Sequence, residues 1–157
     1  MPQTLPPIPR RVRWARVATL VAALMLIGIM VRARCEQMER HGQQALDHGL
    51  DALAATLLRG EDRLADAEQA FGAAARESLS DPYPLFCLSA VGELRESRRD
   101  PAAAGADGWP TAMTQLSAGR LSEARSLIST LAESAADPGQ ARRAALYVRL
   151  IDDLAGR

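Results

Sequence analysis

The pattern of apolar and polar positions changes once along the chain, after a long apolar run near the N-terminus. Residues 17–31 read VATLVAALMLIGIMV and contain no charged side chain, so a helix here would be apolar on all sides. Extended to Trp14 and Arg32, the run is about 19 residues long, or roughly 28 Å as a helix, close to the ~30 Å core of a bilayer. It predicts a transmembrane helix over residues 14–32. The side chains expected to contact lipid are Trp14, Val17, Leu24, Ile29 and Val31.

Two other interpretations of this run stay open. A buried core helix would normally show one polar face, and this run shows none. A cleaved secretory signal also has a basic region followed by an apolar one. The run is longer than a usual signal, however, and Arg32–Cys35 follows it in place of a small-residue cleavage site. An uncleaved anchor is therefore preferred, and cleavage would instead give a soluble exported protein.

After residue 33 the apolar positions recur every three or four residues, which is the spacing of amphipathic helices. A stripe of leucines at 46, 50, 53 and 57 continues the first helix until Gly60 ends it. The expected fold is all-α, with a juxtamembrane helix over 33–59 that leads into a domain of antiparallel helix pairs over 60–157. Within that domain the stripes predict helices over 61–78, 84–97, 110–117, 121–135 and 140–155.

Glycines and prolines interrupt the helical pattern at two places. Gly42 and Gly49 lower the helix propensity after the apolar run, which predicts a bend there. The sequence PAAAGADGWP at 101–110 predicts a loop. Trp109 in this loop is a possible contact for a partner, because tryptophan often dominates binding energy. Packing of Trp109 back over the helices is the alternative.

The charge distribution adds a direction to this picture. The first 35 residues carry six arginines and no acid, so the other 122 residues hold 13 arginines against 19 acids, a net charge of −6. The positive-inside rule then predicts a proline- and arginine-rich cytoplasmic arm over 1–13, a single-pass position in the inner membrane of a bacterium, and a domain outside the cytoplasm. The acidic domain lacks the basic stripe that nucleic acid requires, so no nucleic-acid partner is expected.

The sequence offers no set of residues typical of catalysis or metal binding. His41 and His48 are seven residues apart, whereas two ligands on one helix need a spacing of three or four. Cys35 and Cys87 are best interpreted as unpaired. No phosphate-binding glycine loop and no nucleophile elbow is present. We therefore expect no enzyme activity, no cofactor, no metal and no small-molecule substrate.

The segment 119–124, GRLSEA, resembles the tetratricopeptide repeat (TPR), in which a glycine turns between two helices and a small alanine lets them pack closely. A weaker copy lies within 60–82. The two alanines at corresponding positions are 57 residues apart, whereas the repeat has a period of 34, and a generic array of helical hairpins explains the same pattern. The residues that carry the resemblance are Ala67, Phe71, Ala74, Gly119, Ala124, Ile128 and Pro138.

The resemblance implies a module that binds peptides or protein surfaces without catalysis. The expected function is a membrane-anchored, TPR-like scaffold or assembly factor that binds another envelope protein of unknown identity. The alternative is a structural accessory subunit whose span packs among the helices of a larger membrane complex, with Ala18 and Ala22 as a small-residue face.

Overall fold

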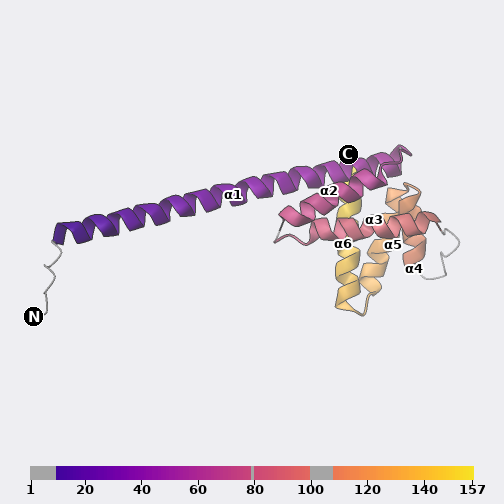
Figure 1. The fold of residues 1–157 in the computed structure, drawn as a ribbon. Coiled ribbons are helices and arrows are strands. Elements are labelled where there is room, and N and C mark those ends of the chain that lie inside the picture. Colours follow the sequence, from indigo (N-terminus) through magenta and orange to yellow (C-terminus); the bar gives the residue numbers. More distant parts are fainter. Residues whose placement is uncertain (1–9, 79, 100–107) are drawn as a thin grey trace, which may run out of the picture. The chain divides into compact units, whose positions relative to one another are not determined.

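The computed structural model describes residues 10–78, 80–99 and 108–157, and it describes side chains from Thr19 onward. In these residues the regular structure is six α-helices, and no strand occurs among them, which confirms the expected all-α class (Figure 1). The chain divides into two compact units, Met1–Met38 and Glu39–Arg157. The helices are α1 (Arg10–Leu58), α2 (Leu64–Glu77), α3 (Tyr83–Arg99), α4 (Gly108–Ser117), α5 (Leu121–Ser134) and α6 (Pro138–Ala155).

The predicted transmembrane helix is wrong. No helix in the part of the chain that the structure describes is long and apolar enough to cross a membrane.

The residues expected to contact lipid lie in or beside the apolar run. Leu24, Ile29 and Val31 are exposed on α1. Trp14 and Val17 belong to the same helix, but their side chains lie outside the described residues, as does most of the predicted arm, residues 1–9. The contacts with lipid that the sequence predicts for residues 14–32 stay a prediction.

In the second unit each helix packs against the next one along the chain, and α6 also returns to α3. Gly42 of α1 faces Glu77 of α2 while Gly49 faces Phe71, so these two helices run antiparallel. The core draws on every helix of the unit. Its large, fully buried side chains include Leu53, Phe71, Val91, Leu116, Ile128 and Leu154.

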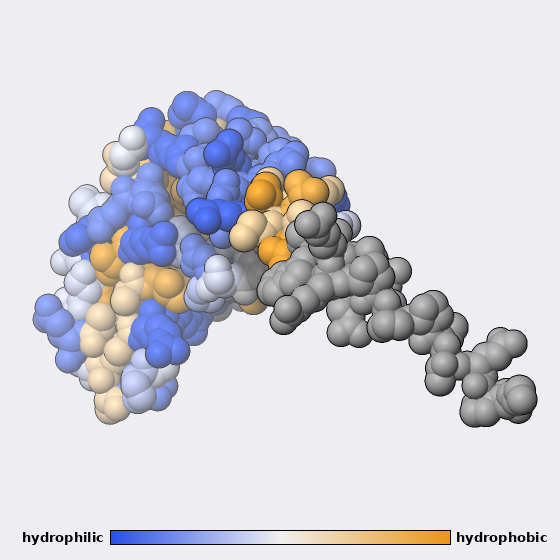
Figure 2. Space-filling view, turned by 90° about the vertical axis from the view of Figure 1, so that its left-hand side faces the viewer, coloured by the Kyte–Doolittle hydropathy of each residue, from blue (hydrophilic) through white to orange (hydrophobic). Residues whose placement is uncertain are grey.

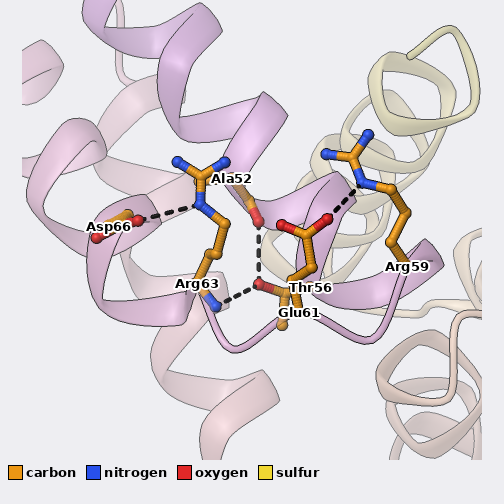
Figure 3. A network of polar contacts seen from close by, with 6 residues as sticks. All are labelled: Ala52, Thr56, Arg59, Glu61, Arg63 and Asp66. Carbon is orange, nitrogen blue, oxygen red and sulfur yellow. Dashed lines mark hydrogen bonds and ion pairs between the residues drawn. The ribbon is translucent and has the colours of Figure 1, made fainter.

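The turn between α1 and α2 depends on one buried hydroxyl (Figure 3). Apart from the two tyrosines, Thr56 is the one buried side chain with a hydroxyl, amide or charged group among the described residues. Its Oγ1 donates to the carbonyl of Ala52 at 3.0 Å and accepts from the backbone N–H of Arg63 at 3.1 Å. Arg63 is the N-cap of α2 and provides no side-chain cap of its own, so Thr56 serves as the acceptor that a helix start requires. Two exposed ion pairs flank the turn: Arg59–Glu61 and Arg63–Asp66.

The turn between α4 and α5 requires glycine for two reasons. Gly119 has φ +75°, a left-handed conformation, and its N–H donates to the carbonyl of Leu116 while the N–H of Arg120 donates to that of Gln115. These bonds form a Schellman motif, which ends helices at glycine. In addition, a Cβ at position 119 would lie 2.3 Å from the carbonyl oxygen of Leu57, so this turn packs directly on the end of α1.

The glycines of α1 have a different role from the bend that the sequence predicts. Helix α1 continues through both Gly42 and Gly49. A Cβ at position 49 would lie 2.6 Å from the ring of Phe71, and one at position 42 would lie 3.4 Å from Cβ of Glu77. The two glycines therefore let α2 approach α1 closely.

We expect Gly119→Ala to be much more damaging than Gly60→Ala. Gly60 shares the positive φ, at +72°, but no atom lies within 4 Å of its Cβ position. Gly60→Ala should lower the free energy of unfolding by about 1–2 kcal/mol, the cost of the left-handed conformation alone. Gly119→Ala adds a clash with backbone and should cost about 3 kcal/mol or more. Urea unfolding followed by circular dichroism measures both, and equal losses would refute the contact with Leu57.

A second pair of variants tests the packing of α2 on α1. Gly92 lies exposed in α3 with nothing within 4 Å of its Cβ position, so Gly92→Ala should raise stability by about 0.5–1 kcal/mol through helix propensity. Gly49→Ala gains the same propensity but collides with Phe71, so it should lower stability by about 1–3 kcal/mol. Thermal unfolding shows whether each variant raises or lowers the Tm. A Tm that rises in both variants would show that the helices can separate without cost.

Candidate functional site

Four of the six aromatic side chains in the sequence form one continuous row in the second unit. The ring of Tyr83 stacks on Phe86, with centroids 6.2 Å apart. Phe86 meets Tyr147 edge-on at 4.8 Å, and Tyr147 meets Trp109 edge-on at 5.1 Å. The row joins α3, α6 and α4. Each such pair contributes about 0.5–1.5 kcal/mol beyond its buried area, so the row holds the three helices in register.

Arginines of α6 cover both ends of this row. The guanidinium carbon of Arg143 lies 4.5 Å from the centroid of the Trp109 ring, and that of Arg149 lies 3.8 Å from the centroid of Tyr83. These are cation–π distances, worth about 0.5–1 kcal/mol at exposed sites. Arg143 is the fourth residue before Tyr147, so the two side chains share one face of α6.

Glu93 of α3 accepts hydrogen bonds from two side chains of α6. Arg143 Nη2 donates to Glu93 Oε2 at 2.6 Å, and the hydroxyl of Tyr147 donates to the same oxygen at 2.8 Å. The side chains of Arg143 and Glu93 are 47% and 34% exposed, and ion pairs with that much solvent contribute about 1 kcal/mol or less. The guanidinium of Arg143 can therefore easily leave Glu93 for another partner. The hydrogen bond from the hydroxyl of Tyr147 to Glu93 is not exchanged so easily.

Both tyrosines of the row are hydrogen-bond donors at neutral pH. Burial raises the pKa of the Tyr147 phenol, and the charge of Glu93 raises it further. Burial likewise raises the pKa of Tyr83, whose hydroxyl donates to Asp153 Oδ2 at 2.5 Å. Each hydroxyl thus keeps its proton and gives its carboxylate a fixed partner.

A pocket of about 330 Å³ opens beside Trp109, between the start of α4, the end of α5 and the start of α6. Its volume is at the lower end of the range for ligand sites in proteins. The wall is apolar and polar in nearly equal parts, and Arg143 is the one charged side chain among its described lining residues. The lining residues are Trp109, Leu131, Ser134, Ala135, Gln140, Arg143 and Ala144.

On the face drawn in Figure 2 the surface is mostly hydrophilic, and apolar side chains gather in separate areas. A second pocket, of about 450 Å³, is lined by Asp51, Ala54, Leu58, Arg59 and Arg157. There Arg157 already binds Asp47 and Asp51 at 2.6 and 2.8 Å. The charged side chains of this second pocket are thus already paired with one another. We therefore take the other pocket, beside Trp109, as the candidate site.

The structure places Trp109 differently from the sequence-based expectation. Residues 101–107 of the expected loop lie outside the described residues, but Trp109 itself lies in the first turn of α4. It is half-buried, packs on Tyr147 and also lines the pocket. The two roles considered for this residue, packing against the helices and contact with a partner, are therefore compatible in one position.

The residues of the TPR resemblance occupy the core and its turns. Ala67, Phe71, Ala74, Ala124 and Ile128 are fully buried. Pro138 is exposed in the first turn of α6, where the side chain of Asp137 accepts hydrogen bonds from the N–H groups of Gly139 and Gln140. These residues shape the hairpins, and none of them lines the pocket.

Glu93 and Arg143 were not predicted from the sequence as members of the site. The spacing of Arg143 and Tyr147 on one helix was a usable signal, because residues four apart share a face. Glu93 gave no signal, since it lies 50 residues away from Arg143. His41 and His48 are exposed, and the described residues contain no group of three or more His, Cys, Asp or Glu side chains that could hold a metal ion.

Comparison with known proteins gives no match: no protein-family model, no curated protein and no solved structure matches the chain. The resemblance to the TPR therefore stays a prediction from the residues between 60 and 138.

Both cysteines are free, and their surroundings differ. Burial raises the pKa of the Cys87 thiol from 9.0 to about 12. A group whose pKa is higher in the folded state contributes stability that is fully present below its unfolded pKa and is lost as the pH rises through the folded value. Between pH 8 and 10.5 the free energy of unfolding should therefore fall by about 2 kcal/mol through Cys87 alone.

The variant Cys87→Ser has no thiol to ionise. In urea unfolding at a series of pH values, its free energy of unfolding should fall less with rising pH than that of the unchanged protein. Cys35 is exposed, so Cys35→Ser is the matched control and should keep the full fall. An identical pH dependence in all three proteins would mean that the Cys87 thiol ionises as easily in the folded state as in the unfolded one.

Proposed function

We propose that the second unit is a helical-hairpin module that binds a short segment of another protein in the pocket beside Trp109. The observation that carries this proposal is the pocket itself, whose wall combines apolar side chains with the polar groups of Gln140, Ser134 and Arg143. Binding sites commonly combine an apolar wall with a few polar groups that fix orientation. Tryptophan and arginine are also the side chains most often found to dominate binding energy at protein interfaces.

The arrangement of the helices supports a TPR-like description as part of the same proposal. Helices α1–α2 and α4–α5 form two hairpins, and the alanines at the corresponding positions, Ala67 and Ala124, are both fully buried. Helix α3 stands between the hairpins in the sequence, which accounts for the 57-residue spacing where a regular repeat would have 34. We propose an array of hairpins with one additional helix.

The size of the pocket favours one side chain of a partner over a whole cofactor. A volume of about 330 Å³ accommodates a leucine or an aromatic side chain with its neighbouring backbone. The described lining includes no pair of side chains suited to acid–base catalysis, so binding is the role we propose. The location of the protein in a bacterial envelope stays a prediction and does not enter this proposal.

The alternative role as an accessory subunit required a membrane-spanning helix packed among others. No helix among the described residues is long and apolar enough to cross a membrane, and this alternative stays a prediction.

The proposal is tested with a random 12-residue peptide library displayed on phage and selected on the immobilised full chain. We expect the unchanged protein to enrich a set of related peptides. Trp109→Ala should weaken their binding by about tenfold or more, because it removes an aromatic wall of the pocket. Fluorescence anisotropy of dye-labelled synthetic peptides measures the dissociation constants of the unchanged protein and of Trp109→Ala alike.

Leu85→Ala provides the matched control. Leu85 is a large apolar side chain on α3, 62% exposed, and it does not line the pocket. Peptide binding should survive this change. No enrichment on the folded protein, or equal binding by Trp109→Ala, would refute the proposed site, and thermal unfolding of each variant excludes loss of folding as the cause.

A further inference from the structure

The pocket beside Trp109 carries charge of one sign, which is positive. Among its seven lining residues the single ionised side chain is the arginine at 143, and the polar groups of Gln140 and Ser134 add hydrogen-bond donors. No carboxylate belongs to the lining. An acidic group of a bound segment would therefore be attracted to the pocket, and a basic group would be repelled.

Arg143 is held by a contact that a ligand can replace. One of its nitrogens, Nη2, donates to Glu93, while a guanidinium carries five N–H donors. The pair is substantially exposed, so little free energy is lost when Arg143 turns to another carboxylate. Glu93 would then keep its hydrogen bond from the buried hydroxyl of Tyr147, at 2.8 Å, and would not be left without a partner.

We infer that the pocket selects a segment in which an aspartate or glutamate neighbours an apolar side chain, and that Arg143 exchanges Glu93 for that carboxylate. This inference rests on the proposed function and names the chemistry of its partner. The apolar side chain fills the space between Trp109, Leu131 and Ala144. The guanidinium stays over the Trp109 ring and reaches the acidic group at the rim. Glu93 acts as a built-in competitor that lowers the affinity for weakly acidic segments.

The same random 12-residue library is the probe, and the sequences that it yields give the first result. Selected peptides should carry Asp or Glu within two positions of a large apolar residue more often than the starting library does. In the synthetic peptides, changing that acid to its amide should weaken binding to the unchanged protein by about fivefold or more. Peptides that are enriched without an acid would overturn the inference while leaving the proposed site in place.

Three variants of the full chain separate the role of Arg143 from a general effect of charge. Arg143→Gln should abolish the preference for acid over amide. Arg142→Gln removes a neighbouring exposed arginine that does not line the pocket, and the preference should persist. Glu93→Gln releases Arg143 from its competitor and should strengthen the binding of acidic peptides by about threefold.

The sign of the Glu93→Gln effect distinguishes recognition from structural support. If Arg143 served only to hold Trp109 and α3 in place, both Arg143→Gln and Glu93→Gln would weaken the binding of acidic and amide peptides alike. That outcome, or an equal loss of preference in Arg142→Gln, would refute the exchange. Failure of the whole proposed function is recognised separately, because then no peptide depends on Trp109.

Discussion

The close approach of the α4–α5 turn to the end of α1 is the constraint on which the rest of the second unit depends. At this point Gly119 lies against the carbonyl of Leu57, with no room for a Cβ atom. The same region is held by Arg98, whose Nη2 donates to the carbonyls of Thr56 and Ser117 at 3.1 and 3.4 Å. Three segments that are distant in the sequence therefore meet around backbone atoms. Because backbone cannot repack as side chains do, this contact fixes the position of the C-terminal end of α4, and Trp109 lies in the first turn of the same helix.

The interactions that hold the second unit together differ in strength. The apolar core is buried, and in the row of aromatic rings Tyr83 and Tyr147 are buried while Phe86 and Trp109 are half-buried. Core and row together hold α3, α4 and α6 in place. The ion pairs lie at the surface and contribute little to stability. Such a division suits a binding module, since a rigid wall shapes the pocket while a weakly held arginine stays available for exchange.

Local sequence pattern predicted most of the second unit for reasons that the structure makes clear. The stripes of apolar residues marked the helices because one face of each is buried, as Leu50, Leu53 and Leu57 show in α1. Gly119 was recognised as a turn, and its positive φ is the reason for glycine there. The glycines of α1 were misjudged, because their effect on helix propensity is local whereas the approach of Phe71 is not. The apolar run was misjudged as a membrane span, since no helix in the part of the chain that the structure describes is long and apolar enough to cross a membrane.

The sequence by itself determined the class of fold, the approximate helices of the second unit and the small residues at its turns. These follow from periodicity and backbone conformation, which are properties of neighbouring residues. Only the tertiary structure decided that Trp109, Arg143, Tyr147 and Glu93 belong to one site. The reason is physical: these side chains come from three helices, and contacts between helices depend on how whole elements pack, which no local pattern records.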